Sequence, residues 1–436
     1  MSKKIAFFTL GCRVNNYEST ALEDSARFSG YTIVNWGEPA DIAVVNSCAL
    51  TILAEAKTRQ AVRIFARNNP DSAIAITGCY AQTSPLDLLK LENVKWVIGN
   101  SLKARTIDII NTNPPMDFPH IFVDKTITSS KETICANSPL TDRMNLKIQD
   151  GCDNACSYCI IPRARGLPRS RNFDEIIADA ENMVSRGVRE LIITGINISK
   201  FSSQGKILAD LTDSLNNIKD LLRIRIGSIE PPDFGVDALL ERIADTSHKL
   251  CPHLHISSQS LSDNVLSAMR RKYTSTEFFK MLEKIRNSAP NISVGTDIIC
   301  GHPYETEEDF AQTRTRLADS GMSYAHVFTY SQRPKTLAEK MPQVPVEIRK
   351  ERANTLREDA KKLHSDFIKK NSNKPIQVLL ENEVRQGTYL AYTDNYIQTE
   401  IEIGESGLKN RLALVEIEST TTNDDSPVKA KFLNLQ

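Results

Sequence analysis

The sequence contains no apolar run long enough to cross a membrane. A spanning helix requires about eighteen consecutive apolar residues, and no stretch of this chain approaches that length. The apolar run at residues 5–10 is too short for the hydrophobic region of a secretion signal, and no small-residue cleavage site follows it. We therefore expect a cytoplasmic protein with no membrane partner.

An excess of charge of either sign is also missing. The chain has 54 Lys and Arg against 54 Asp and Glu, so its overall field favours neither nucleic acid nor membrane, and any basic site has to be local. The 40% of hydrophobic and 25% of charged residues are those of an ordinary globular protein and exclude collagen-like, coiled-coil and low-complexity chains. A length of 436 residues predicts about two to four domains.

The cysteine count does not fit a disulfide framework. Nine cysteines are an odd number, and no secretion signal accompanies them. In such a chain, cysteines that cluster in sequence or in space indicate metal binding or catalysis. Their positions therefore carry much of the functional prediction.

Hydrophobic periodicity predicts an α/β protein with three units. Over residues 1–115, short β-branched runs alternate with amphipathic stretches, as in βα units around a parallel sheet. A polar, proline-bearing passage at 116–139 is interpreted as a linker. Residues 140–372 hold six predicted strands with five intervening helices, which indicate a partial or complete β/α barrel. Residues 373–436 are all β and predict a small closed barrel.

The strongest chemical signal is a group of three cysteines, Cys152, Cys156 and Cys159, directly after the first predicted barrel strand. A structural zinc site takes four ligands, and a ferredoxin run supplies a fourth cysteine nearby; neither pattern occurs here. Three thiolates can hold a [4Fe-4S] cluster and leave one iron open, as a catalytic metal requires. The alternative, three buried structural cysteines, is disfavoured because clustered cysteines usually mark metal sites.

A second group of cysteines is dispersed in sequence. Cys12, Cys48 and Cys79 each follow a predicted strand of the amino-terminal unit. Because the carboxyl ends of parallel strands meet at one edge of a sheet, the three thiols are predicted to converge there on a second cluster. Three unrelated buried thiols are the alternative, since sheets often bury cysteine.

The spacing Cys-x3-Cys-x2-Cys after the first barrel strand resembles that of radical S-adenosylmethionine enzymes. The resemblance implies that the open iron binds S-adenosylmethionine, which one electron cleaves to a radical that abstracts a hydrogen. With the strand-end cysteines and the terminal β unit, nearly the whole chain resembles the methylthiotransferase family. The matching phrases are residues 9–18, 44–48, 77–85, 147–152, 165–171, 228–231, 251–255, 270–273 and 295–299.

Two phrases, residues 11–18 and 77–83, are most similar to the branch that modifies N6-threonylcarbamoyladenosine beside the tRNA anticodon. The resemblance implies that sulfur and then a methyl group are added to carbon 2 of the adenine. It implies two [4Fe-4S] clusters, S-adenosylmethionine, tRNA as partner and a reductant such as flavodoxin or ferredoxin, and it leaves the sulfur donor unidentified. All six cysteines would be catalytic cluster ligands, with the amino-terminal cluster presenting the sulfur.

Other functions are consistent with parts of the pattern. The same chemistry could act on isopentenyladenosine in tRNA or on a ribosomal-protein aspartate. An iron–sulfur electron carrier and a non-catalytic RNA-binding protein are further alternatives. A carrier would be expected to close its clusters with four protein ligands, and a binding protein would need neither cysteine group.

Polar residues at strand ends are candidates for holding S-adenosylmethionine. Each could instead be a turn or capping residue, a role that fits any single one equally well. By motif match, and with the tyrosine that lies between two cluster cysteines, the candidates are Tyr158, Gly195, Asn197, Ser228, Glu230 and Gln259.

Two features suggest RNA contact. Four arginines follow the cysteine loop, at 163, 165, 169 and 171. Guanidinium groups suit phosphate, which favours RNA contact. The alternative interpretation is an ordinary solvated basic loop. Residues 387–396 resemble the TRAM domain, an RNA-binding appendage, and Tyr392 and Tyr396 could stack on bases or simply pack the small barrel.

The sequence departs from the family pattern near the expected cofactor and substrate mouth. Leu261 and Tyr304 replace glycines, and Phe201 with Ser202 replaces Tyr-Gly. Because of these departures, a different substrate is an alternative for this chain. Cys135, Cys251 and Cys300 belong to neither group and are predicted to be structural or incidental.

Overall fold

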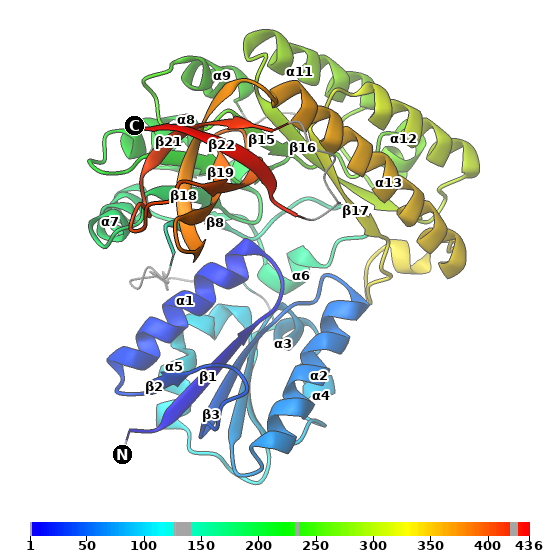
Figure 1. Ribbon diagram of the computed structural model, residues 1–436. Helices are drawn as coiled ribbons and strands as arrows, with labels where there is room; N and C mark the ends of the chain where they lie inside the picture. The colour runs from blue at the N-terminus through cyan, green and yellow to red at the C-terminus, as the bar shows by residue number, and fades with distance from the viewer. Residues whose placement is uncertain (1, 126, 128–140, 232–234, 419–425) are drawn as a thin grey trace.

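The computed structural model describes residues 2–125, 127, 141–231, 235–418 and 426–436. Its amino-terminal domain is a six-stranded parallel sheet in the order β2-β1-β3-β4-β5-β6 (Figure 1). The strands are β1 (Lys4–Thr9), β2 (Thr32–Val34), β3 (Ile42–Ser47), β4 (Ala73–Gly78), β5 (Val94–Ile98) and β6 (His120–Phe122). The helices are α1 (Arg13–Phe28), α2 (Ile52–Asn68), α3 (Cys79–Thr83), α4 (Pro85–Leu88) and α5 (Thr106–Thr112), with a 3-10 turn η1 (Asn100–Arg105).

The two faces of this sheet pack in two separate hydrophobic cores, because successive strand residues point to opposite faces. Ile42 and Val44 of β3 pack with α1 and α5, whereas Ala43 and Val45 of the same strand pack with Val62 and its neighbours on α2. Side chains of successive strand residues point to opposite faces, so a strand buried on both sides reads as a continuous apolar run. The parallel sheet predicted for this part of the chain is confirmed.

The second domain is a β/α barrel with an open side. Its strands are β7 (Arg143–Lys147), β10 (Glu190–Thr194), β13 (Arg223–Ile226), β14 (Ser228–Ile229), β15 (His253–Ile256), β16 (Ser293–Cys300) and β17 (Tyr324–Thr329). They form the parallel sheets β13-β10-β7 and β14-β15-β16-β17, and the bridge between Ile224 and Leu250 joins the two. Within the described strands β7 and β17 are unpaired edges, so the partial form of the predicted barrel is the one observed.

Helices cover the outside of this barrel. They are α7 (Phe173–Ser185), α8 (Leu208–Asn216), α9 (Val236–Ala244), α11 (Ser275–Ser288), α12 (Glu307–Asp319) and α13 (Val346–Asn371), with the short α6 (Ile161–Arg165) and α10 (Asp263–Ala268). Thr274 begins α11 and Thr306 begins α12, and each makes a reciprocal capping box with the acidic residue three positions on. Such caps satisfy otherwise unpaired N–H groups and fix where a helix starts.

The carboxyl-terminal unit is a closed five-stranded barrel in the order β18-β19-β20-β22-β21. The strands are β18 (Pro375–Arg385), β19 (Thr388–Thr393), β20 (Gln398–Glu402), β21 (Leu412–Ile417) and β22 (Val428–Leu435). This confirms the predicted small barrel. Its turn at 393–396 packs against the amino ends of the β/α-barrel strands, where Arg223 Nη1 donates to the Tyr392 carbonyl at 2.8 Å and Arg225 Nη1 to the Asp394 carbonyl at 2.9 Å.

The boundary between the first two domains differs from the predicted one. His120–Phe122 fall in the range interpreted as a linker, yet they pair with β5 as the last strand of the amino-terminal sheet. The run is only three residues long, too short to show a strand period in the sequence. Most of the remaining predicted linker, 128–139, lies outside the described residues.

Candidate iron–sulfur and S-adenosylmethionine site

The amino-terminal thiols lie at the carboxyl edge of three adjacent strands. Cys12 precedes α1 after β1, Cys48 follows β3, and Cys79 is the first residue of α3 after β4. The order β1-β3-β4 makes these strands neighbours, so the predicted convergence of the three cysteines on one edge is what the structure has. Gly78 immediately before Cys79 has φ +98°, and a Cβ there would lie 2.4 Å from the Ser47 carbonyl oxygen, so only glycine fits.

Each sulfur of this triad meets polar or thiol groups. Burial raises the pKa of Cys48 to about 12, and the nearby Cys79 and Cys12 thiols add to the rise. The backbone N–H of Leu50 donates to the Cys48 sulfur at 3.5 Å, and the Asn100 amide to the Cys79 sulfur at 3.6 Å. Three close thiols, two of which accept from N–H groups, have the chemistry of a donor set that can hold an iron–sulfur cluster, because a bound metal deprotonates such thiols and hydrogen bonds tune the thiolates.

The second triad lies in the loop between β8 (Gln149–Asp150) and α6. The backbone N–H groups of Asn154 and Ile161 donate to the sulfurs of Cys152 and Cys159 at 3.4 Å each. Burial raises the pKa of Cys159 to about 12, and the neighbouring Cys156 thiol contributes. Backbone N–H groups of the loop therefore donate to two of its three sulfurs, and as in the first triad N–H groups face thiols that burial affects.

A polar group that includes two of the predicted cofactor residues surrounds this loop. Glu230 Oε2 accepts from the amides of Asn154 at 2.5 Å and Asn197 at 3.1 Å, and its Oε1 lies 2.5 Å from Arg271 Nη1. Arg271 Nη1 also lies 3.5 Å from the Cys156 sulfur. Asn197 Oδ1 is buried and has no hydrogen-bond partner in the described part of the chain. Arg271 lies in the phrase at 270–273, but no role was predicted for it from the sequence.

A cavity of about 500 Å³ connects the two triads. Its wall contains Cys12 and Cys48 from the amino-terminal domain and Cys159 from the barrel loop. Side chains of β16, β17 and the segments beside them complete it: Asp297, Ile299, Phe328 and Tyr330. Nothing in the local sequence around either triad shows that the two groups share one space.

The remaining predicted cofactor residues divide into two sets. Tyr158 and Gln259 line the cavity, and Gln259 has φ +66°, an unfavourable backbone state for a residue with a side chain. Gly195 follows β10, where an added Cβ would lie 2.7 Å from Ile198. Ser228 begins β14, pairs with His255 and is exposed. Gly195 and Ser228 lie at strand ends, and neither belongs to the described wall of the cavity.

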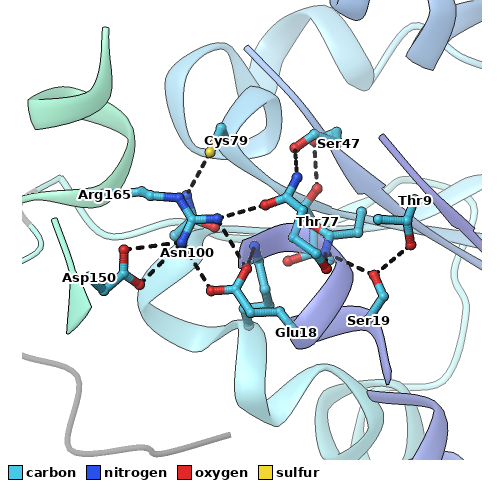
Figure 2. Close-up of polar contacts among 12 residues, drawn as sticks. Thr9, Glu18, Ser19, Ser47, Thr77, Cys79, Asn100, Asp150 and Arg165 are labelled. Carbon is cyan, nitrogen blue, oxygen red and sulfur yellow. Dashed lines mark hydrogen bonds and ion pairs between the residues drawn. The ribbon is translucent and has the colours of Figure 1, made fainter. Parts of the chain in front are cut away.

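A buried ion network joins α1 of the amino-terminal domain to α6, which follows the cysteine loop of the barrel; Figure 2 shows Arg165 of α6 beside Glu18 and Asp150. Arg165 Nη1 and Nη2 lie 3.0 and 3.1 Å from the two oxygens of Glu18 on α1, and Arg165 also pairs with Asp150 at 3.1 Å. Lys103 and Lys147 each approach Glu18 at 2.6 Å. Burial by itself raises the pKa of Glu18, but the three cations outweigh it and lower that pKa well below its usual range.

The network also reaches the loops that carry the thiols. Arg165 Nη2 donates to Asn15 Oδ1 at 2.6 Å, and the Asn15 amide donates to the carbonyls of Leu10 and Ser47, close to two cysteines of the first triad. Asn100 joins the Cys79 sulfur to the Ala164 carbonyl of α6, which lies against α3 (Figure 1). These contacts fix the cluster loop of the barrel relative to the amino-terminal sheet.

The RNA contact predicted for the arginine loop is wrong for Arg165, which is 1% exposed and belongs to this network. Arg171 is held by Asp179 and by the Lys147 carbonyl, and Arg169 by the carbonyls of Arg165 and Leu167. Local sequence shows that arginines are present but not which acids fold against them. Arg163 is the exposed member, and its contact with RNA stays a prediction.

Tyr392 and Tyr396 lie between the small barrel and the β/α barrel. The Arg143 guanidinium covers the Tyr392 ring at 4.2 Å, and that of Arg225 covers Tyr396 at 4.8 Å. Both rings thus belong to a domain interface. Their stacking on bases stays a prediction.

The departures from the family pattern have structural explanations. Leu261 and Phe201 are buried in the barrel core, at 0% and 3% exposure, where they contribute packing. Tyr304 has φ +70°, which explains why a glycine is the easier residue at that turn. Cys251 and Cys300 are buried and unbridged, as expected for structural thiols, and Cys135 lies outside the described residues.

One further cluster borders the cavity. Ligand atoms of His255, Asp297 and His326, on the adjacent strands β15, β16 and β17, lie within 4.8 Å of one another. The Asp297 carboxylate lies 3.1 Å from His255 Nε2 and 3.6 Å from His326 Nδ1, and Ser257 donates to it at 2.7 Å. No role was predicted for this group from the sequence, because its three residues come together only through the pairing of β15, β16 and β17.

Comparisons with known proteins fit this architecture. The Radical SAM superfamily matches residues 146–317, and the Uncharacterized protein family UPF0004 matches residues 4–99. The chain is 35% identical over 407 residues to the threonylcarbamoyladenosine tRNA methylthiotransferase MtaB of Bacillus subtilis, covering 90% of this chain and 89% of the relative. The chain belongs to the radical S-adenosylmethionine methylthiotransferase family. It is thus an enzyme that transfers a sulfur-containing group.

Other relatives of this methylthiotransferase differ in their named substrates. MtaB of Aquifex aeolicus is 34% identical and covers 95% of this chain and 99% of its own. The tRNA-2-methylthio-N(6)-dimethylallyladenosine synthase of Endomicrobium trichonymphae is 32% identical and covers 89% and 90%. Among solved structures, the radical S-adenosylmethionine methyltransferase TsrM of Kitasatospora setae has a TM-score of 0.53 at 13% identity, covers 78% of this chain and 77% of its own, and shows a shared fold.

Family membership confirms the cofactor prediction, since radical S-adenosylmethionine methylthiotransferases use S-adenosylmethionine and two [4Fe-4S] clusters. In the described residues, no helix combines the length and apolar character that crossing a membrane requires.

Proposed function

We propose that this methylthiotransferase adds a methylthio group to carbon 2 of N6-threonylcarbamoyladenosine in tRNA. The observation that carries the proposal is the cavity whose wall contains thiols of both cysteine triads. A reaction that generates a radical at one cluster and delivers sulfur from another needs both groups beside one substrate atom. The relatives named for threonylcarbamoyladenosine, at 34–35% identity, support this choice of base.

The six thiols fit the two clusters by their chemistry. Cys12, Cys48 and Cys79 would hold one cluster, and the triad of the barrel loop, Cys152–Cys159, would hold the other. When bound, the cofactors supply the radical and the sulfur that an unreactive aromatic C–H bond demands. The protein excludes water from the thiols by burial and directs N–H groups at the sulfurs.

S-adenosylmethionine is assigned to the polar group beside the second triad. The side-chain oxygen of Asn197, which is buried and has no hydrogen-bond partner among the described residues, and the Glu230 carboxylate offer acceptors for its amino group, while Arg271 offers a donor for its carboxylate. Tyr158 and Gln259, which line the cavity, would bound the space for its adenosyl part. Gly195 and Ser228 serve as strand-end backbone around that space.

Each of the three units has a separate role in this reaction. Residues 1–115, extended by β6, carry the sulfur-presenting triad, residues 140–372 carry the radical chemistry, and residues 373–436 form an RNA-contacting appendage of the TRAM type. A flavodoxin or ferredoxin supplies the electron.

Dimethylallyladenosine in tRNA is the second candidate substrate, because relatives named for it are 32% identical over a similar span. The two substrates differ only in the group on N6, so the same chemistry serves both. The choice between them is measurable directly.

The test is mass spectrometry of nucleosides from tRNA of a strain that lacks this protein, with and without a plasmid copy of its gene. The methylthio form of threonylcarbamoyladenosine should disappear in the deletion strain and return with the plasmid. A plasmid copy with Cys156→Ala should fail to restore it. Loss of the methylthio form of dimethylallyladenosine instead would transfer the assignment to the second candidate.

A further inference from the structure

The two candidate substrates differ most in charge. A threonylcarbamoyl group ends in a carboxylate, whereas a dimethylallyl group is apolar. An enzyme for the first substrate gains from a cation near the site, because a carboxylate taken out of water is costly unless it is paired. The position of this cation is constrained, because the cation has to lie within reach of the substituent of an adenine held beside the thiols.

Strand β17 leads away from the sulfur cavity. Phe328 and Tyr330 line that cavity, and His326 lies two residues before Phe328 on the same face of the strand. Phe328 is 47% exposed, so its ring is free to stack on a base. A two-residue step along a strand is about 7 Å. The threonylcarbamoyl chain, with extended backbone geometry, places its carboxylate about 5–6 Å beyond N6.

His326 lines a second cavity of about 530 Å³, between β17, α13 and the small barrel. Helix α13 lies along β17 (Figure 1) and contributes Arg357, Lys361 and His364 to the lining. No Asp or Glu occurs among the described lining residues. Lys361 is already paired with Glu358 at 3.0 Å, and burial lowers the pKa of His364, which favours its neutral form. His326 and Arg357 are therefore the groups of this lining that are best placed to meet an anion.

Neighbouring groups hold two of these side chains in position. Arg357 Nη1 donates to Asn354 Oδ1 at 2.8 Å, and Nη2 approaches the carbonyl of Val327, the residue after His326, at 3.4 Å. Asp297 faces His326 Nδ1 at 3.6 Å. Burial raises the pKa of Asp297, but hydrogen bonds from His255 and His326 outweigh it and hold that pKa below its usual range. The carboxylate is thus ionised and directs the imidazole, and no partner of His326 Nε2 occurs within the described part of the chain.

We propose that His326 and Arg357 form a subsite for the carboxylate of the N6 substituent, while the adenine lies against Phe328 in the sulfur cavity. In this subsite His326 acts as an imidazolium, because both ring nitrogens donate only in the protonated ring: Nδ1–H faces Asp297, and Nε2–H donates with the Arg357 guanidinium to the substrate carboxylate. The subsite selects an acidic N6 group over an apolar one. This inference rests on the proposed function and names the feature of the substrate that the site recognises.

The test uses the full-length enzyme with both clusters reconstituted and two anticodon stem-loop RNAs. One RNA carries threonylcarbamoyladenosine and the other its methyl ester, which has nearly the same shape, the same phosphates and no carboxylate charge. Methylthiolation is followed by nucleoside mass spectrometry to obtain kcat and KM for each RNA. The variants are His326→Gln and Arg357→Gln, both at exposed side chains, with Lys362→Gln on the same helix as the matched control, since Lys362 is exposed and not in the described lining. Thermal unfolding confirms that each variant is folded.

The wild-type enzyme should prefer the acid to the ester by about 10- to 100-fold in kcat/KM, the range of hydrogen bonds to a charged group. Either lining variant should reduce this preference at least fivefold, mainly through KM, and the control should keep it. Equal rates for acid and ester in the wild type would overturn the subsite but keep the proposed function. An equal loss on both RNAs in the variants would assign the cations to phosphate and also overturn it. Absence of product from both RNAs would overturn the proposed function itself.

Discussion

Replacing Glu18 by Gln removes the central anion of the network between the two triads. Glu18 is 2% exposed and meets Lys103, Lys147 and Arg165. Lys147 and Arg165 also pair with Asp150. Lys103, which is 2% exposed, pairs with Glu18. The substitution thus leaves a buried ammonium group without a counter-charge. Breaking such a pair costs about 3–5 kcal/mol.

The assay is specific to the affected domain. The two tryptophans of the chain, Trp36 and Trp96, both lie in the amino-terminal domain, so tryptophan fluorescence during urea unfolding reports on that domain. The free energy of unfolding should fall by about 3–5 kcal/mol in Glu18→Gln. Glu23→Gln on the same helix is the matched control, because its carboxylate pairs with the half-exposed Arg27 at 3.7 Å and should contribute below about 1 kcal/mol.

Two further measurements separate charge from packing. The double variant Glu18→Gln with Lys103→Met should regain part of the loss, since it removes the unpaired ammonium. The pKa of Glu18 is lowered in the folded protein, so its stabilisation is complete above the unfolded pKa of about 4.3 and is lost as pH falls below that value. A change below about 0.5 kcal/mol in Glu18→Gln at neutral pH would refute the reasoning.

The remaining predictions concern the clusters and the base of the barrel. Cys156→Ala should abolish S-adenosylmethionine cleavage, whereas Cys48→Ala should leave cleavage and block methylthiolation; equal loss of cleavage would contradict the division. Arg271→Gln should slow 5′-deoxyadenosine formation at least about tenfold while tRNA binding in a filter assay stays unchanged. Burial raises the pKa of Glu190, but Arg225 and Arg143 together outweigh it and the pKa falls to about 2, so Glu190 contributes about 3 kcal/mol above pH 4.5 that is lost toward pH 2. Urea unfolding of Glu190→Gln should show that loss at pH 7 and a smaller one at pH 3.5.

Much of the fold follows from local patterns in the chain. Runs such as 42–47 and 73–78 are apolar throughout because both faces of their strands are buried. Capping residues such as Thr274 and Thr306 lie where helices begin. The cysteines at strand ends could be placed on one edge because parallel strands share a direction. The three-residue β6 was missed, since it is too short to show a period.

The sequence alone determined the fold class, through the strand and helix periods, and both triads, through the spacing of 152–159 and the position of each dispersed cysteine just after a strand, while its phrases carried the resemblance to the family. Each of these signals is local to one element of the chain. The shared cavity, the burial of Arg165 and the group around Asp297 were decided only by the tertiary structure. Arg165 and Glu18 are 147 positions apart, and nothing in either neighbourhood shows that they pair. The energy of a charge depends on its distance from its partner and on the surrounding dielectric. Both quantities exist only once the two domains have packed together.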